Sequence, residues 1–169
     1  TSASMASYAR LTGLQGVVAF PVGKVALGKI AQAVAYGATC LEVCGDFDDA
    51  QRLVLEAANK LPVYMLNSVN PYRLEGQKTI MREMLQQRRW RVPDWLVVPG
   101  GNLGNSSAFG KAFIELHALG LIKRMPRIAI VQAEGASPFY QSWKQNFKDR
   151  ITMRAETVAT AIRIGNPTN

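Results

Sequence analysis

The residues that most constrain the fold lie between Trp95 and Gly110. An apolar segment, Trp-Leu-Val-Val-Pro, runs into a glycine-rich turn and then directly into an amphipathic helix. Gly100, Gly101 and Gly104 lack a Cβ, so the turn can approach an anion closely and point successive N–H groups at it. The helix that follows adds unpaired N–H donors and the positive end of its dipole. This segment predicts a strand, turn and helix that either bind a phosphate or form only a tight turn.

The rest of the chain alternates short apolar segments with amphipathic ones. We expect strands at 16–21, 40–43, 63–66, 95–98 and 128–132, and helices at 2–11, 25–35, 46–60, 75–88, 106–119 and 137–147. Strands of this length separated by helices indicate βαβ crossovers, so the predicted fold class is α/β, with parallel sheets and flanking helices. In such sheets ligands bind beyond the carboxyl ends of the strands. A boundary between two lobes is expected in the polar, aperiodic segment 67–73.

Composition narrows the function classes. A chain of 169 residues that is 48% apolar can bury a core, and no apolar run approaches the ~18 residues of a membrane span. The first residues do not resemble a signal peptide, so we expect a cytoplasmic protein with no membrane partner. Cys40 and Cys44 are four apart on a predicted strand, roughly ~13 Å from each other, which is too far for a disulfide without a bend. Reduced core thiols are favoured over a metal pair, and no metal site is expected.

The net charge of +8 has three candidate explanations. The densest basic segments, 86–91, 123–124 and 144–150, all lie near predicted helix ends, where cations complement the helix dipole and stay solvated. An anionic small-molecule substrate would account for part of the charge, and nucleic acid for all of it. Solvated helix ends are favoured, and no nucleic-acid partner is expected because the basic segments lack interleaved stacking aromatics.

The segment that follows the third predicted strand suits a second oxyanion. Arg73 can bind a phosphate bidentately, and Asn67 and Ser68 can donate to the remaining oxygens. Pro71 stiffens the loop, which lowers the entropy lost on binding. The alternative is a helix N-cap and turn with a surface arginine.

Five motifs in this order resemble the threonine synthase family, pyridoxal-phosphate enzymes of fold type II. Together they extend over nearly the whole chain. They are Gly23-Lys-Val-Ala-Leu-Gly-Lys-Ile-Ala-Gln-Ala-Val-Ala-Tyr-Gly-Ala, Asn67-Ser-Val-Asn-Pro-Tyr-Arg-Leu-Glu-Gly-Gln-Lys-Thr, Pro99-Gly-Gly-Asn-Leu-Gly-Asn, Val131-Gln-Ala-Glu-Gly-Ala and Glu156-Thr-Val-Ala-Thr-Ala-Ile-Arg-Ile-Gly-Asn-Pro.

The resemblance implies the conversion of O-phosphohomoserine and water to L-threonine and phosphate, with pyridoxal 5'-phosphate as cofactor. It implies that residues 1–68 form part of a small substrate-side lobe and residues 69–169 part of a large cofactor-binding lobe. The implied cofactor-phosphate residues are Gly100, Gly101, Asn102, Leu103, Gly104 and Asn105. The implied substrate residues are Asn67, Ser68 and Arg73 for its phosphate, Thr1 and Ser2 beside its carboxylate, and Lys24, which is equally well explained as a solvated residue of a first helical turn.

The family's lysine that binds the cofactor covalently lies in a Ser-Phe-Lys-Asp-Arg motif, which the resemblance places before Thr1. Lys148, in Phe147-Lys-Asp-Arg150, follows the glycine turn and lacks the preceding serine, so it is not assigned that role. No catalytic residue is therefore expected in these 169 residues, and catalysis is expected of a longer parent polypeptide. The alternative is a noncatalytic phosphate- or cofactor-binding module. The oligomeric state stays open, with a homodimer as one option.

Overall fold

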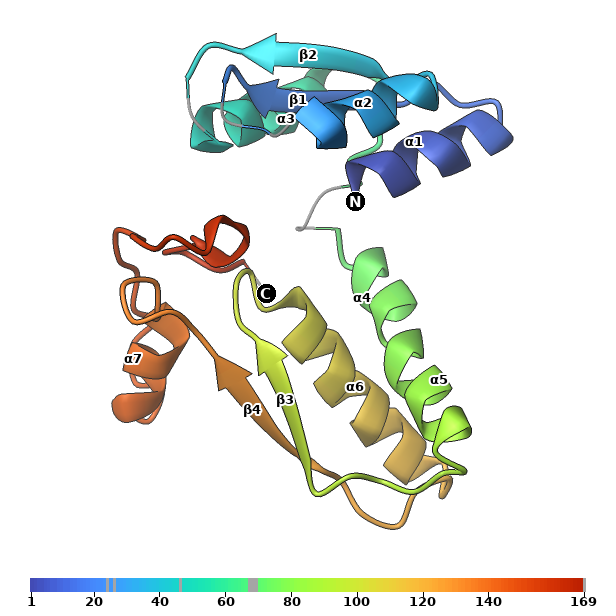
Figure 1. The fold of residues 1–169 in the computed structure, drawn as a ribbon, viewed down its shortest axis with the longest axis vertical. Coiled ribbons are helices and arrows are strands. Elements are labelled where there is room, and N and C mark those ends of the chain that lie inside the picture. The colour runs from blue at the N-terminus through green and yellow to red at the C-terminus, as the bar shows by residue number, and fades with distance from the viewer. Residues whose placement is uncertain (24, 26, 46, 67–69, 169) are drawn as a thin grey trace. The chain divides into compact units, whose positions relative to one another are not determined.

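The computed structural model describes residues 1–23, 25, 27–45, 47–66 and 70–168. The chain folds into two compact units, Thr1–Asn67 and Ser68–Asn169, and each contains one two-stranded parallel sheet with helices packed on it (Figure 1). The predicted α/β class is confirmed. Which unit serves the substrate and which the cofactor stays a prediction.

The first unit alternates helices and strands. Its elements are α1 (Ser2–Leu11), β1 (Val17–Pro21), α2 (Leu27–Ala35), β2 (Thr39–Val43) and α3 (Phe47–Lys60). β1 and β2 pair in parallel, while α3 packs on β1 and α1 on α2. The chain leaves α2 through Gly37, whose φ of 81° is left-handed, and the Ala38 N–H donates to the Ala33 carbonyl at 3.0 Å. This glycine cap ends the helix as its sequence predicts.

The second unit contains the larger core. Its elements are α4 (Tyr72–Gln77), α5 (Thr79–Gln87), β3 (Trp95–Pro99), α6 (Gly104–Ala118), β4 (Arg127–Val131), α7 (Pro138–Lys144) and the short 3₁₀ helix η1 (Thr160–Ile162). β3 and β4 pair in parallel. One face of α6 packs with α5 and the sheet around a cluster of buried apolar side chains that includes Leu85, Val98, Phe109 and Phe113.

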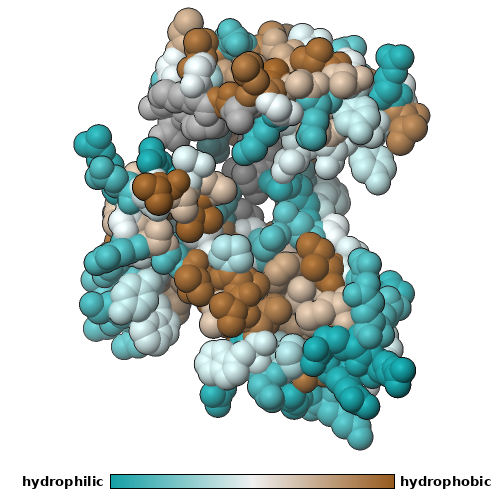
Figure 2. Space-filling model, viewed as in Figure 1, coloured by the Kyte–Doolittle hydropathy of each residue, from teal (hydrophilic) through white to brown (hydrophobic). Residues whose placement is uncertain are grey.

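The other apolar side of β3 is exposed. Trp95 is 55% exposed and Val97 is 65% exposed, and both alternate with the more buried Leu96 and Val98. Figure 2 shows hydrophobic side chains gathered over β3 and β4 on the face in view. Strands of parallel sheets are usually apolar on both faces, since helices cover both. Among the described residues, no helix is long and apolar enough to cross a bilayer.

The predicted strand at 63–66 is wrong. These residues form neither helix nor strand, and the Val63 N–H donates to the Leu61 carbonyl at 2.7 Å. Among the described residues, no strand runs beside this segment. An apolar run without a neighbouring strand cannot form a ladder of hydrogen bonds.

The predicted helix at 75–88 forms as two helices and begins earlier. The Asn70 side chain accepts a hydrogen bond from the Tyr72 N–H at 2.9 Å, which starts α4 three residues before the expected position. The Thr79 hydroxyl donates to the Gly76 carbonyl at 2.6 Å at the junction with α5. A threonine that bonds the preceding turn competes with the helical hydrogen bond.

The predicted burial of the cysteines is also wrong in part. Cys40 is half-buried, whereas Cys44 is exposed because β2 ends at Val43. Both thiols are unpaired.

Candidate anion-binding site

The glycine loop, residues 100–103, connects β3 to α6. The Gly100 N–H donates to the Val131 carbonyl at 2.7 Å, which extends the pairing of β3 and β4 by one bond. A Cβ on Gly100 would lie 2.5 Å from Cγ2 of Ile130, so the chain can leave the strand this way only without a side chain. The expectation that Gly100 offers its N–H to an anion is therefore corrected, since this donor is used within the sheet.

The next residues keep their donors open. Leu103 has a φ of 63°, the left-handed conformation, which costs a non-glycine residue about 1–2 kcal/mol. The backbone N–H groups of Gly101, Leu103, Gly104 and Asn105 have no acceptor among the described residues. Leu103 is followed directly by a 15-residue helix, whose dipole favours negative charge at this end.

The side chain of Asn102 is held by the C-terminal end of the chain. Its Nδ2 donates to Oγ1 of Thr168 at 2.8 Å, and its Oδ1 accepts from the Thr168 N–H at 2.7 Å. The side-chain amide is therefore engaged within the protein, and a role of Asn102 at the cofactor phosphate stays a prediction. Asn102 fixes the C-terminal segment, residues 150–168, to the glycine loop.

The C-terminal segment also contacts the loop at η1. A Cβ on Gly101 would lie 3.4 Å from Cα of Ile162 and 3.5 Å from the Ala161 carbonyl oxygen. The segment is held further by Glu156, whose N–H donates to the Gly135 carbonyl at 2.8 Å. The fifth sequence motif therefore packs against the third.

Arg73 lies in the first turn of α4. It is half-buried, and its N–H donates to the carbonyl of the buried Asn70 at 3.1 Å. Asn70 starts the helix, and an Asn two residues before a helix is a common turn former. Asn67, Ser68 and Lys24, the other residues predicted to bind substrate anions, lie outside the described residues.

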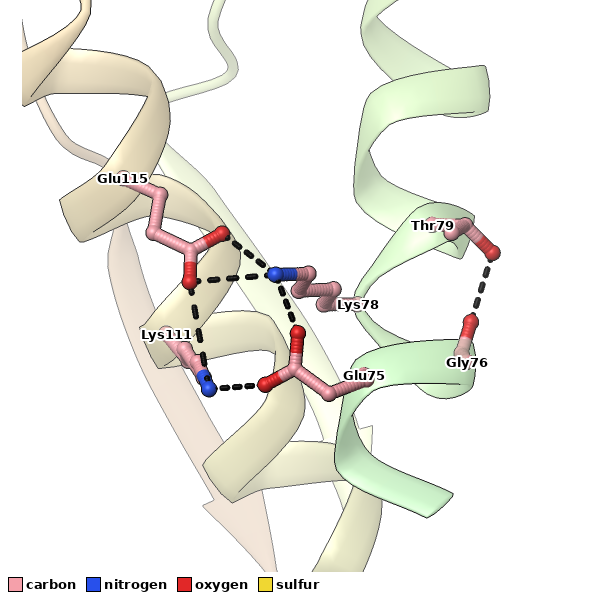
Figure 3. Close-up of polar contacts among 6 residues, drawn as sticks. All are labelled: Glu75, Gly76, Lys78, Thr79, Lys111 and Glu115. Atoms are coloured by element: carbon pink, nitrogen blue, oxygen red, sulfur yellow. Dashed lines mark hydrogen bonds and ion pairs between the residues drawn. The ribbon is translucent and has the colours of Figure 1, made fainter. Parts of the chain in front are cut away.

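Four charged side chains hold α4 against α6 (Figure 3). Lys78 pairs with Glu75 at 2.5 Å and with Glu115 at 2.8 Å, while Lys111 also pairs with Glu75. Hydrogen bonds from Lys111 and then Lys78 hold the pKa of Glu75 below its ordinary 4.5. Hydrogen bonds to Glu115 and then Glu75 raise the pKa of Lys78 above its ordinary 10.5.

These ion pairs also give the relative direction of the two helices. Glu75 meets Lys111 and Lys78 meets Glu115, so residue numbers rise together and α4 runs parallel to α6. Arg73 precedes Glu75 on α4, and the open N–H groups precede Lys111 on α6. The guanidinium-bearing turn and the open N–H groups therefore belong to the same end of the second unit.

Comparison with known proteins identifies the family. Residues 1–169 match the family described as pyridoxal-phosphate dependent enzyme. The chain belongs to this family. It is 49% identical to threonine synthase of Methanocaldococcus jannaschii over all of this chain and 42% of that protein, and 44% identical to chloroplastic threonine synthase 2 of Arabidopsis thaliana over 99% of this chain and 33% of that protein. It thus spans less than half the length of these curated relatives.

Solved structures share the fold. Maize serine racemase superposes with a TM-score of 0.78 at 21% identity, covering 96% of this chain and 47% of that one. The processed form of threonine deaminase isoform 2 from Solanum lycopersicum gives a TM-score of 0.80 at 20% identity, covering 97% of this chain and 43% of that one. These likenesses confirm the fold expected of a fold type II pyridoxal-phosphate enzyme.

The glycine loop fits the phosphate of the family's cofactor. It offers backbone N–H groups that have no acceptor among the described residues, together with a helix N-terminus. These are donors suited to a doubly charged anion.

Thr1 and Ser2, predicted beside the substrate carboxylate, belong to the first unit. Thr1 precedes α1 and Ser2 is its first residue, and both are exposed. Exposed residues at a helix start are accessible to a carboxylate. Their assigned role stays a prediction.

Proposed function

We propose that the polypeptide to which these residues belong is a threonine synthase. It would convert O-phosphohomoserine and water to L-threonine and inorganic phosphate, as a pyridoxal-phosphate dependent lyase of cytoplasmic amino-acid biosynthesis. The observation that carries this proposal is the 49% identity to the threonine synthase of Methanocaldococcus jannaschii along the entire chain.

The glycine loop would hold the cofactor phosphate. The N–H groups of Gly101 and Leu103 in the loop, and of Gly104 and Asn105 at the start of α6, are open to its oxygens, while Gly100 shapes the turn. When bound, the cofactor withdraws electrons from the substrate carbons, which the proposed elimination and hydration require. The protein contributes orientation and a fixed anion site.

A second anion site distinguishes a phosphorylated substrate from an unphosphorylated one. Arg73 lies at the same end of the second unit as the glycine loop, and its guanidinium can bind two phosphate oxygens at once. Asn67 and Ser68 would add donors from the preceding residues, and Lys24 would add charge. The half-buried position of Arg73 makes its charge less screened than that of a fully solvated arginine.

The substrate carboxylate would be held by Thr1 and Ser2. Both offer hydroxyl donors, and Ser2 also offers the N–H of a first helical turn. The covalent cofactor lysine, expected before Thr1, stays a prediction, as do the homodimer option and the absence of nucleic-acid, membrane and metal partners.

The test is an assay of the full-length protein. It is loaded with pyridoxal phosphate and given O-phosphohomoserine, and threonine and inorganic phosphate are quantified together. The proposal expects the two products in equal amounts. A protein that binds the cofactor but releases neither product would be the noncatalytic module that the alternative describes.

A further inference from the structure

The helix that carries Arg73, α4, is weakly held by its own sequence. It is six residues long, all of them described, and none of the six is fully buried. Helices this short are unstable alone, and Gly76 lowers helix stability further. Leu74 packs against the apolar core but is only partly buried. The position of α4 therefore depends on its contacts with neighbouring elements.

Four charged side chains supply such contacts and form a closed ring, which we call the charge ring (Figure 3). Lys78 lies 2.5 Å from Glu75 and 2.8 Å from Glu115. Lys111 also pairs with Glu75, and it lies 3.9 Å from Glu115. An isolated exposed pair contributes little, and a network of several charges is the arrangement in which ion pairs count. The charge ring therefore joins α4 to α6 through two cations that each contact both carboxylates.

The charge ring fixes the rotation of α4 as well as its place along α6. Glu75 and Lys78 are three residues apart and share one face, which their ion pairs turn toward α6. At 3.6 residues per turn, Arg73 lies about 200° around the helix from Glu75. Arg73 thus starts from the side of α4 that is turned away from these pairs. Any slide or rotation of α4 would move its guanidinium.

We propose that the charge ring positions Arg73 for the phosphate of the substrate. This inference rests on the proposed function, in which Arg73 binds that phosphate. The four members of the charge ring are then positioning residues, because they act through α4 and do not touch the substrate. The charge ring also ties the turn of Arg73 to α6, whose first residues are proposed to hold the cofactor phosphate, so it would set the spacing of the two anions.

The experiment measures Glu75→Gln and Lys111→Met in the full-length holoenzyme. Steady-state kinetics with O-phosphohomoserine give KM and kcat, and calorimetry gives the dissociation constant of inorganic phosphate. Either substitution should raise both KM and this dissociation constant about tenfold, because a shift of about 1 Å is enough to misalign a binding group. The kcat and the affinity for pyridoxal phosphate should stay at the parent values. Lys111→Met alters the charge ring from α6 and decides the outcome if Glu75→Gln does not fold.

The same substitutions in an Arg73→Ala background separate positioning from a general loss of structure. If the charge ring acts through Arg73, neither substitution should change KM or the phosphate dissociation constant further once the guanidinium is gone. Equal changes in both backgrounds would overturn the inference, as would parent values of both constants in Glu75→Gln and Lys111→Met.

The matched control is Glu56→Gln. Glu56 pairs with Lys60 at 2.6 Å within the single helix α3, so its loss removes an exposed ion pair without loosening one helix from another. This variant should keep the KM for O-phosphohomoserine and the phosphate dissociation constant of the parent. A tenfold rise in both constants here would overturn the inference, since any lost ion pair would then have the same effect.

The two probes keep this inference distinct from the proposed function. A parent that forms no threonine, but whose affinity for inorganic phosphate depends on both Arg73 and Glu75, would refute the proposed function and support the charge ring as a positioning device. A parent that forms threonine, with KM and phosphate affinity unchanged in the charge-ring variants, would support the proposed function and overturn the inference.

Discussion

The two positions in the second unit that we propose to bind a phosphate are made from different parts of the chain. At the glycine loop the donors are backbone N–H groups, fixed by the path from β3 into α6. At the start of α4 the donor is the guanidinium of Arg73, on a long side chain. The first position is sensitive to added atoms and the second to lost charge, so different substitutions should disable them separately.

The largest effect is expected at Arg73, the proposed phosphate position whose donor is a side chain. In the full-length enzyme, Arg73→Ala should lower kcat/KM for O-phosphohomoserine by about a hundredfold or more, because a charge-assisted bidentate pair is lost. Steady-state kinetics would measure the loss, and absorbance titration should show unchanged affinity for pyridoxal phosphate. Arg73→Lys keeps the positive charge but cannot bind two phosphate oxygens at once, so it should recover part of the lost kcat/KM. Equal losses of substrate use and cofactor affinity would contradict the division into two positions.

The next largest effect is expected in the glycine loop, the proposed phosphate position whose donors are backbone N–H groups. Gly100→Ala places a Cβ 2.5 Å from Cγ2 of Ile130, a branched side chain that cannot move aside freely. Overpacking of this kind costs about 1–3 kcal/mol of stability, and cofactor affinity should fall with it as the turn shifts. Urea unfolding of the full-length apo protein measures the stability.

The control for this substitution lies on α6. At Gly110 a Cβ would meet nothing within 4 Å, so Gly110→Ala should stabilise the helix by about 0.5–1 kcal/mol. If the two substitutions changed stability alike, Gly100 would not be held against β4 as described.

A smaller effect is expected where the C-terminal segment meets the loop. Asn102→Ala removes the acceptor of the Thr168 N–H, so hydrogen exchange of that amide should accelerate about tenfold. Thr168→Val tests the same contact from the other side. In the double variant the amide at position 168 should exchange no faster than in the faster of the two single variants. Additive losses would mean that the two side chains act independently.

The smallest effect concerns the ion pairs between α4 and α6. Lys78→Met should lower the urea midpoint only slightly, because half-exposed ion pairs contribute little. The lowered pKa of Glu75 gives a contribution that is present above its ordinary 4.5 and is lost as pH falls through the lowered value. The raised pKa of Lys78 gives one that is present below its ordinary 10.5 and is lost as pH rises through the raised value.

The midpoint difference between Lys78→Met and the parent should therefore be largest between about pH 5 and 10 and shrink on both sides. Lys60→Met, which breaks the exposed pair with Glu56 on α3, serves as the control. A difference that did not change with pH would show that Lys78 acts through packing alone.

Local sequence patterns predicted most of the fold. Helix 2–11 forms with the expected bounds, and four of the five predicted strands form within a residue of their predicted ends, because the apolar periodicity of each segment fixes it locally. The segment 63–66 shows the limit of this reasoning. Its apolar letters are those of a strand, but a strand exists only where another strand pairs with it.

The site was harder to predict than the fold, because composition does not say which donors are already used. Glycine spacing identified the loop, yet only the structure shows that the Gly100 N–H and the Asn102 side chain are taken up inside the protein. Which acceptor each donor bonds depends on tertiary contacts, and a sequence motif does not show those contacts.

The most direct test of the central claim is a crystal structure of the full-length protein with pyridoxal phosphate. We predict that the phosphate oxygens lie within about 2.7–3.2 Å of the open N–H groups of Gly101 and residues 103–105. A phosphate bound elsewhere, with the start of α6 covered by the protein's own side chains, would contradict it.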